Sequence, residues 1–432
     1  MIAREHYVAL THRNFRLIWL GLLASITGSM MQNAALLWHV SLLWPEKKAL
    51  ALGLVGLVRV VPIACLSMFS GVVADAWNRR RLMLFTQTSA AVVSLALAVL
   101  TFRGLSATWP IYLLAFLGAG VGTFDLPARQ ALVPTLVPRA HLPNAISMNT
   151  IMFQAASVVG PSLAGIVIAA AGVGWVYVAN ALSFGCVIVA LLMMRGVTGK
   201  PLREGHEPAD DISLRAAREG LKFVFESPLI RSTMLLDFFA TFFSSASALL
   251  PIFAQDVLHV GAKGYGWLYA APAVGAVAMS AVMIPLTNRI ERRGPVLLWA
   301  VAGYGLATVV FGMSTWFWLT FVCLAMTGAM DTISMIIRNI VRQLETPDRL
   351  RGRMIGVNMV FFQGGPQLGE LEAGFVANWL GPVFSVVSGG VGCLIATAWV
   401  AATTPTLRHY HADSGETATA SARIRSKSPD PV

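Results

Sequence analysis

Two segments of the chain, at 153–165 and 362–374, are variants of one another. Both begin with Phe-Gln and end with Ala-Gly, and residue 362 stands 209 positions after residue 153. Matches continue on both sides at this offset, pairing Arg129 with Arg338, Pro138 with Pro347, Ile146 with Ile355, Asn149 with Asn358, Val167 with Val376 and Gly172 with Gly381. Hydrophobic composition alone does not produce such matches. We therefore predict two copies of one unit, an arrangement that in membrane proteins places a site between the copies.

The composition is that of a polytopic helical membrane protein. Hydrophobic residues make up 56% of the 432 residues and charged residues only 12%, and the mean hydropathy is +0.67. A soluble protein carries about twice this share of charge. Long apolar runs separated by short polar or basic pieces predict membrane-spanning helices. The net charge of +11 comes from basic residues in the predicted loops, so it does not indicate a nucleic-acid partner.

Twelve membrane spans are predicted from the apolar runs. Most of them exceed the roughly 20 residues that a bilayer requires, so we expect tilted helices. The predicted fold class is an all-α membrane protein with twelve transmembrane helices in two pseudo-symmetric six-helix bundles. The spans are 15–43, 50–74, 80–102, 107–133, 144–171, 174–195, 229–256, 264–288, 294–314, 316–341, 354–379 and 381–404.

The orientation follows from the positions of Lys and Arg. One side receives most of them, including Arg79, Arg80 and Arg81. The opposite loops carry only Lys47, Lys48, Arg103 and Lys263. Because the basic side of a membrane protein is cytoplasmic, both termini are predicted to lie in the cytoplasm.

Four regions are predicted along the chain. An N-terminal six-helix bundle occupies 1–196 and a C-terminal six-helix bundle occupies 228–404. A cytoplasmic linker at 197–227 contains an amphipathic helix that begins near Ser213, with Leu214, Leu221 and Val224 on its apolar face. The Ser- and Thr-rich residues 405–432 are predicted to form a disordered cytoplasmic tail.

The loop between spans 2 and 3 carries Gly71, Asp75, Arg79 and Arg80 in the order Gly-x-x-x-Asp-x-x-x-Arg-Arg. This pattern resembles the cytoplasmic loop signature of the major facilitator superfamily. The resemblance implies a gating motif in which Asp75 docks near the start of span 11, around Gly352. The second copy has Ile284 in place of Gly71, and then Asn288, Arg292 and Arg293. We expect this second gate to be less tightly closed, because it lacks both the glycine and the carboxylate.

Span 5 contains Gly160, Pro161 and Gly165. This Gly-Pro-x-x-x-Gly sequence is similar to the antiporter signature of exporters in the same superfamily. Physically, the two glycines allow another helix to approach closely, and the proline favours a bend. Ordinary helix packing needs the same residues, so the motif favours export over import without excluding either.

A longer resemblance narrows the branch of the superfamily. Asp125, Pro127 and Arg129, followed by Pro143 with Asn144, are similar to the branch that includes bacterial siderophore (enterobactin-type) and macrolide exporters. The resemblance runs from about residue 15 to residue 408. It implies a transporter in a bacterial cytoplasmic (inner) membrane, and it does not identify the substrate.

Charged residues inside the spans are the best candidates for functional side chains, because each is costly in lipid unless it has a partner or faces water. Asp125 and Arg129 stand four residues apart on span 4 and are predicted to pair. Asp331 and Arg338 share one face of span 10 and are expected to act in a gate. Asp237 on span 7 and Gln32 on span 1 belong to polar stripes expected to line the cavity.

Span 11 carries Glu370 and Glu372, which point about 200° apart around a helix. Gln363, Gln367 and Glu370 share one face, predicted to be the wet face, and we select Glu370 as the protonatable residue. Arg59 on span 2 is either a counter-charge to one of these acids or a cation reaching the outer interface.

The predicted function is proton-coupled efflux of a mid-sized, partly lipophilic small molecule by alternating access. Apolar residues on the cavity spans support such a substrate: Met30, Met31, Trp38, Phe238, Phe239, Phe242, Phe243, Trp316 and Trp318. Uptake of a small polar solute is the alternative transport function. A membrane-embedded enzyme or a non-transporting sensor is the alternative from another functional class. No phosphate loop, zinc signature or catalytic elbow occurs, so we predict no enzyme, metal or cofactor. We expect a monomer in the lipid bilayer.

Overall fold

The computed structural model describes residues 8–195, 221–243 and 246–411, and these residues are almost entirely helical. Six long helices come first: α3 (Arg13–Leu43), α4 (Lys48–Ala76), α5 (Arg79–Phe102), α6 (Trp109–Leu132), α7 (Leu142–Ala171) and α8 (Val173–Met193). The second half contains α10 (Pro228–Phe243), α12 (Gly261–Leu286), α13 (Arg293–Met313), α14 (Phe317–Glu345), α15 (Asp348–Leu380) and α16 (Pro382–Thr403). Short elements include α2 (Val8–Thr11) and α17 (Pro405–Arg408).

Eleven helical segments within the described residues are long and apolar enough to cross a membrane. The twelfth predicted span, 354–379, corresponds to α15, which is 33 residues long but more polar than the others. Its polarity comes from glutamine and glutamate side chains, which include Gln367, Glu370 and Glu372. A span of this kind is expected to be shielded from lipid, and α15 packs against α4, α10 and α16.

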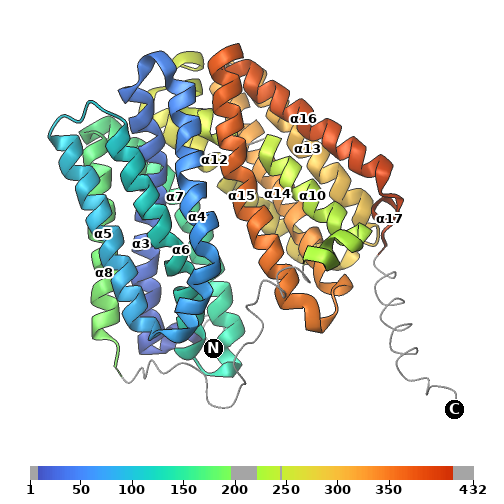
Figure 1. Cartoon of the computed structure of the whole chain (residues 1–432), viewed down its shortest axis with the longest axis horizontal. Coiled ribbons are helices and arrows are strands. Elements are labelled where there is room, and N and C mark those ends of the chain that lie inside the picture. The colour runs from blue at the N-terminus through green and yellow to red at the C-terminus, as the bar shows by residue number, and fades with distance from the viewer. Residues whose placement is uncertain (1–7, 196–220, 244–245, 412–432) are drawn as a thin grey trace.

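Each half forms its own bundle, and Figure 1 shows α3 to α8 on one side and α10 to α17 on the other. We call the end at which α3 begins and α16 ends the terminal face, and the opposite end the far face. Gly172 and Gly381 end α7 and α15 with φ of 90° and 91°, values that glycine adopts without strain. These two glycines are partners in the 209-residue repeat, so the repeat extends to backbone conformation.

The two halves meet along two helix pairs, α7 with α12 and α4 with α15. A Cβ atom placed on Gly165 would lie 2.6 Å from the carbonyl oxygen of Ala262 and 2.9 Å from the Cα of Gly266. A Cβ on Gly374 would lie 2.7 Å from the carbonyl oxygen of Ala49. The backbones are therefore in direct contact at both crossings, and only glycine leaves room for this.

The two crossings are equivalent under the repeat. Gly374 follows Gly165 by 209 residues, and Gly266 follows Gly53, its equivalent at the other crossing, by 213 residues. A Cβ on Gly53 would lie 2.9 Å from the Cα of Gly374. The segments at 153–165 and 362–374 thus end on the glycines that join the two halves.

Buried side chains connect the halves at the far face. One apolar cluster combines Leu37, Leu52 and Tyr177 of the first half with Phe253 and Tyr265 of the second. Toward the terminal face the described residues form separate clusters, one within the first half and two within the second. Figure 1 shows the same arrangement, because the two bundles converge at one end and diverge toward the end at which α3 begins.

Two predictions about secondary structure are wrong, one for span 229–256 and one for the start of the tail at 405–432. Span 229–256 is not one regular helix, because α10 ends at Phe243 and is followed by a 3-10 turn at Ala246–Leu249, by α11 (Leu250–Ile252) and by a π-helix at Phe253–Val257. Pro251 lacks the amide hydrogen that a regular helix requires at this point.

The predicted disordered tail is ordered as far as residue 411, because Leu407 and Tyr410 are buried and Tyr410 donates a hydrogen bond to Glu345.

Most of the predicted linker, including Ser213 and Leu214, lies outside the described residues. Its last part is helical at residues 221–226, and Val224 there is buried against Ile230 and Met354. Leu221 is exposed. The end of the linker therefore packs on α10 and α15.

Gly165→Ala is expected to destabilise the protein although alanine is the better helix former. The same substitution at Gly185, where an added Cβ meets nothing within 4 Å, is the matched control. Intrinsic helix propensity favours alanine over glycine by about 1 kcal/mol, so Gly185→Ala should keep or raise the unfolding midpoint in detergent. Gly165→Ala should lower that midpoint, because α12 must move away. An unfolding midpoint of Gly165→Ala equal to or above that of Gly185→Ala would contradict the crossing.

Candidate functional site

Helix α6 has two exposed faces. Leu113 and Leu117 are exposed on one face, in the half of the helix nearer the far face. Gly122 lies nine residues after Leu113, and Leu126 lies nine residues after Leu117, a spacing that corresponds to about 180° around a helix. Gly122, Leu126 and Gln130 are also exposed. The first face is apolar and suited to lipid. The second face is on the opposite side, and a Cβ on Gly122 would meet no atom within 4 Å.

Helix α14 repeats this pattern at the 209-residue offset. Val322 and Met326 are exposed on the lipid-type face, and nine residues later Asp331 and Met335 are accessible on the opposite side. Asn339 continues this stripe one turn further toward the terminal face. The stripes on α6 and α14 occupy equivalent positions in the two halves. We infer that they line an aqueous cavity that opens at the terminal face, because an exposed carboxylate at mid-helix is not compatible with lipid.

Asp125 anchors a buried polar network inside the first half. The Arg129 side chain donates to Asp125 Oδ2 at 2.5 Å, which confirms the predicted pair. Asp125 Oδ1 accepts from Thr86 at 2.9 Å and from Gln87 at 2.8 Å, both on α5. Ser25 of α3 donates to Gln87. The network joins α3, α5 and α6 and leaves the acid fully satisfied.

The equivalent arginine of the second half has different partners. Arg338 is 2% exposed, and its Nη1 lies 2.5 Å from Asp237 Oδ1 on α10. Its Nη2 donates to Asp331 Oδ1 at the longer distance of 3.4 Å. The residue that corresponds to Asp125 is Ser334, so Arg338 has no acid one turn before it. Its charge is instead balanced across helices, which places Asp237 in a buried ion pair rather than on the predicted cavity stripe.

A second buried arginine lies one turn further along α14. Arg342 donates from Nε to the carbonyl oxygen of Arg338 at 3.1 Å and from Nη1 to the side-chain oxygen of Asn358 on α15. The two arginines and the acids Asp237 and Asp331 together carry no net charge when all four are ionised. Such a group is stable in a membrane interior only with its partners in place.

Glu370 lies where α15 crosses α4. A Cβ placed on Gly56 would lie 2.8 Å from Glu370 Cβ and 3.1 Å from Glu370 Oε2. Oε2 is buried and has no hydrogen-bond partner among the described residues. Arg59, one turn after Gly56, is the cation that acts electrostatically on this carboxyl, and it donates to Asn33 at 3.2 Å. No ion pair between Arg59 and Glu370 occurs among the described residues, so the role of Arg59 as a counter-charge stays a prediction.

The remaining candidates on α15 divide between two faces. Gln367 shares the α4-facing side with Glu370, and its side-chain oxygen is also buried without a hydrogen-bond partner in the described part of the chain. A Cβ on Gly365 would meet Thr241 and Phe238 of α10, which fits the expected helix-contact face. The side chain of Gln363 lies outside the described residues.

Several predicted cavity residues lie elsewhere. Gln32 accepts hydrogen bonds from Ser94 at 2.7 Å and from Asn180 at 2.8 Å, so it faces α5 and α8 inside the first half. Buried polar groups take the nearest partners, and here these lie within the bundle. The apolar list is also corrected. Trp38 contacts Tyr265 in the far-face cluster, and Trp316 and Trp318 are largely exposed near the far face, where lipid surrounds the bundle.

The two arginines of the predicted gating motif make hydrogen bonds within their own half. Arg79 donates to the carbonyl oxygen of Ala131 at 3.1 Å, and Arg80 donates to that of Leu192 at 3.3 Å. These carbonyls lie at the C-terminal ends of α6 and α8, where cations are favoured. Arg292 is exposed and Arg293 half-buried at the start of α13. The surroundings of Gly71 and the side chains of Asp75 and Asn288 lie outside the described part of the structure, so the docking of Asp75 stays a prediction.

The antiporter motif divides its contacts between two neighbours. A Cβ on Gly160 would lie 2.8 Å from the carbonyl oxygen of Thr27 on α3, inside the first half. The carbonyl oxygen of Pro161 would lie 2.6 Å from a Cβ on Gly266, across the interface. Gly165 continues this contact with α12. The motif therefore attaches α7 to its own bundle and to the other half at once.

A polar group closes the far face, and sequence reasoning did not assign it. Lys48 of α4 forms an ion pair with Asp256 at 2.8 Å and donates to Gln255 at 3.2 Å. Gln255 donates to Ser41 at 2.8 Å. We call these four residues the far-face latch. The sequence carries one signal for this pair. The predicted far-face ends of the spans hold few charged residues, and Lys48 and Asp256 are two of them with opposite sign.

The π-helix at Phe253–Val257 presents the two latch residues of the second half. It is followed by His259, whose φ of 52° is a left-handed conformation that is uncommon for a residue other than glycine. π-helical turns and backbone strain are frequent where a helix must present side chains for function. The irregular end of span 7 thus serves the closure of the far face.

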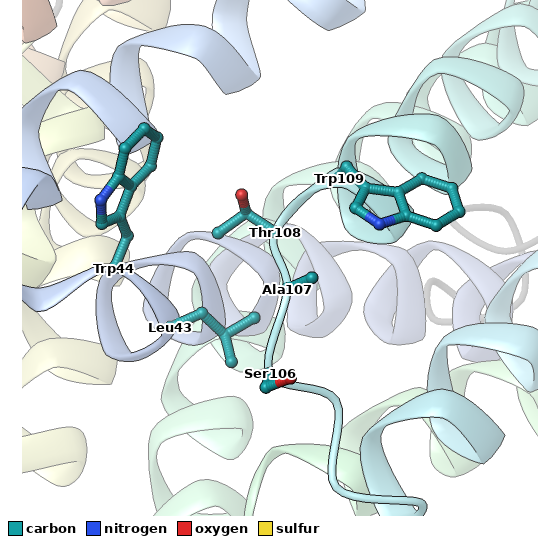
Figure 2. A pocket seen from close by; sticks show the side chains of 6 residues that line it. All are labelled: Leu43, Trp44, Ser106, Ala107, Thr108 and Trp109. Atoms are coloured by element: carbon teal, nitrogen blue, oxygen red, sulfur yellow. The ribbon is translucent and has the colours of Figure 1, made fainter.

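A surface pocket lies between the end of α3 and the start of α6 (Figure 2). Leu43, Trp44, Ser106, Ala107, Thr108 and Trp109 line it, and none of them is charged. Tryptophan is typical of the membrane interface. This pocket belongs to the first half alone and is not part of the inter-half site. Among the described residues, no group of three His, Cys, Asp or Glu side chains is placed to hold a metal ion.

The profile of a protein family described as "Transmembrane secretion effector" matches residues 5–423. The chain belongs to this family of the major facilitator superfamily. It is a membrane transporter and not an enzyme. The enterobactin exporter EntS of Escherichia coli (strain K12) is 26% identical to it over 402 residues, which cover 93% of this chain and 94% of that protein. The same exporter from Shigella boydii serotype 18 is 26% identical over 387 residues, covering 89% and 90%.

Solved structures share the fold at low sequence identity. A POT family transporter in complex with 5-aminolevulinic acid has a TM-score of 0.73 at 10% identity and covers 91% of this chain and 96% of its own. A bacterial homologue of the human lysosomal transporter Spinster, inward-facing and unoccupied, has a TM-score of 0.71 at 15% identity, with 91% and 98% covered. These matches confirm the predicted all-α fold of the superfamily.

Breaking the far-face latch should increase access to residues behind it. The four natural cysteines are first replaced, and Val40→Cys is then introduced as the single thiol. Val40 is buried in the far-face cluster, so labelling of this thiol reports on opening of the far face. Because both latch charges are partly exposed, their pair contributes at most about 1 kcal/mol, so Asp256→Asn should raise the labelling rate by a membrane-impermeant maleimide up to about fivefold. The exchange Lys48→Asp with Asp256→Lys should restore the original rate. Equal labelling rates in all variants would refute the latch.

Moving the acid partner of Arg338 tests the asymmetry between the halves. Asp237→Asn should lower the free energy of unfolding by about 3 kcal/mol, because the loss of one partner leaves a buried charge. Adding Ser334→Asp recreates the arrangement of Asp125 with Arg129 and should recover at least half of that loss. Denaturation in detergent micelles measures both. A further loss on adding Ser334→Asp would show that Arg338 needs an acid on α10 itself.

Proposed function

We propose that this protein is a secondary exporter that moves a mid-sized, partly lipophilic molecule out of the cytoplasm by alternating access. The observation that carries the proposal is the arrangement of contacts between the halves. They are joined by two glycine crossings and a closed far face, and exposed stripes line their terminal-face side. Two rigid bundles with this arrangement can exchange one closed end for the other by rotating about the crossings.

The direction and the location rest on sequence and relatives. The basic loops support the assignment of the terminal face to the cytoplasm of a bacterial inner membrane. With this assignment, the conformation is one that is open toward the cytoplasm. A cavity open to the cytoplasm is the state in which an exporter loads. The relative in Escherichia coli is named an exporter, and export is therefore favoured over uptake. Its substrate class, a siderophore, and the amphiphilic drugs are the candidate cargoes.

Protons are proposed as the coupling ion, with Glu370 as their carrier. The Glu370 carboxyl lies between the two halves, next to Gly56 and under the influence of Arg59. A charge at this place acts on both halves, so adding or removing its proton changes how strongly they attract one another. A proton moving down the gradient supplies about 2.3 kcal/mol per 100 mV, which is enough to bias such an equilibrium.

The test compares Glu370→Gln with Glu372→Gln, a matched removal of a carboxyl from the other face of α15. The proteins are reconstituted in vesicles loaded with enterobactin or with a macrolide, and efflux is started by a pH gradient. Glu370→Gln should lower gradient-driven efflux at least about fivefold while substrate exchange without a gradient continues. Glu372→Gln should behave as the unmodified protein. Gradient-driven efflux that is unchanged in Glu370→Gln would remove this residue from the coupling mechanism.

A further inference from the structure

Asp331 is the one carboxylate of the α14 stripe formed by Asp331, Met335 and Asn339, and it lies at the end of the stripe nearer the far face. Its side chain is 49% exposed, although it lies midway along a membrane-spanning helix. The equivalent position of α6 is Gly122, which carries no side chain and faces open space. The two stripes are therefore alike in shape and different in charge, with a single acid on one wall.

Only one oxygen of this carboxyl is engaged. Oδ1 accepts from Arg338 Nη2 at 3.4 Å, and no hydrogen bond or ion pair of Oδ2 occurs among the described residues. Arg338 has its closer partner in Asp237, at 2.5 Å. Asp331 thus helps to balance a buried arginine with one oxygen and presents the other to the cavity.

The accessible side chain one turn beyond this position is apolar in both stripes. Met335 follows Asp331 by one turn on the same face and is 38% exposed, and Leu126 at the equivalent place on α6 is 37% exposed. Methionine and leucine side chains adapt to ligands of different shape. A ligand that fits this site has an apolar body and one group that donates to a carboxylate.

We propose that Asp331 is the substrate-binding carboxylate of the cavity and that it receives the protonated amine of a lipophilic compound. An ammonium group donates to Oδ2 while Oδ1 keeps Arg338 in place, and the bond is a charge-assisted one in a site of low dielectric. The apolar remainder of the compound lies along Met335 and Leu126. This inference rests on the proposed export function and narrows its substrates to organic amines.

The test uses two probes that differ in charge. One is a macrolide with a dimethylamino group, and the other is an analogue in which this nitrogen is acylated and carries no charge. Binding to the purified protein is measured through the intrinsic tryptophan fluorescence. Asp331→Asn should weaken binding of the amine about tenfold or more and leave the neutral analogue unchanged, because a charge-assisted hydrogen bond is lost. Asp331→Glu, which keeps the charge, should retain binding of the amine.

Asp331→Asn also removes a partner of Arg338, so its unfolding midpoint is measured beside that of Asp331→Glu. The inference is overturned if the amine binds equally to the unmodified protein and to Asp331→Asn. It is also overturned if both probes lose the same affinity, since Asp331 would then only hold the cavity in shape. Failure of the export function looks different: the unmodified protein would then move neither probe across vesicle membranes.

Discussion

The contact of backbone with backbone at Gly165 and Gly374 is the constraint on which the arrangement of the molecule depends. The glycine positions at both crossings carry no side chain, so the backbones of the two halves come into contact there. Two bundles that meet along such narrow crossings are suited to rotate against one another. The same repeat that places the glycines also makes the two crossings equivalent, so a rotation that opens one end of the interface closes the other.

Charge is distributed around these crossings less symmetrically than the backbone. In the first half Asp125 and Arg129 neutralise each other on one helix, and the exposed stripe of Gly122, Leu126 and Gln130 is uncharged. In the second half Arg338 is shared by Asp237 and Asp331, so one carboxyl remains accessible from the cavity. Duplication supplies the scaffold, and substitutions such as Ser334 for an acid create the difference between the walls. The first half is thus suited to support and the second to binding.

The sequence predicted the fold well because its main signals are local. Apolar run lengths located most of the long helices within a few residues, and the repeat indicated the helices that join the halves. The site was predicted less completely, because partners across helices leave no local signal. Asp125 and Arg129 were found since they are one turn apart, whereas the pair of Arg338 with Asp237 spans 101 positions of the chain. Gln32 was misplaced because a polar stripe does not reveal which neighbours satisfy it, and the far-face latch depends on a π-helix that no periodicity predicts.

Rotation about the glycine crossings is tested most directly by distances measured at both ends of the same molecule. Spin labels at Arg81 and Arg289 report on the terminal face, and labels at Trp109 and Trp316 report on the far face; all four side chains are exposed. Double electron–electron resonance is recorded in vesicles with and without a pH gradient and an exported compound. The account predicts that the first distance shortens as the second lengthens. Distances that change in the same direction, or at one face alone, would contradict it.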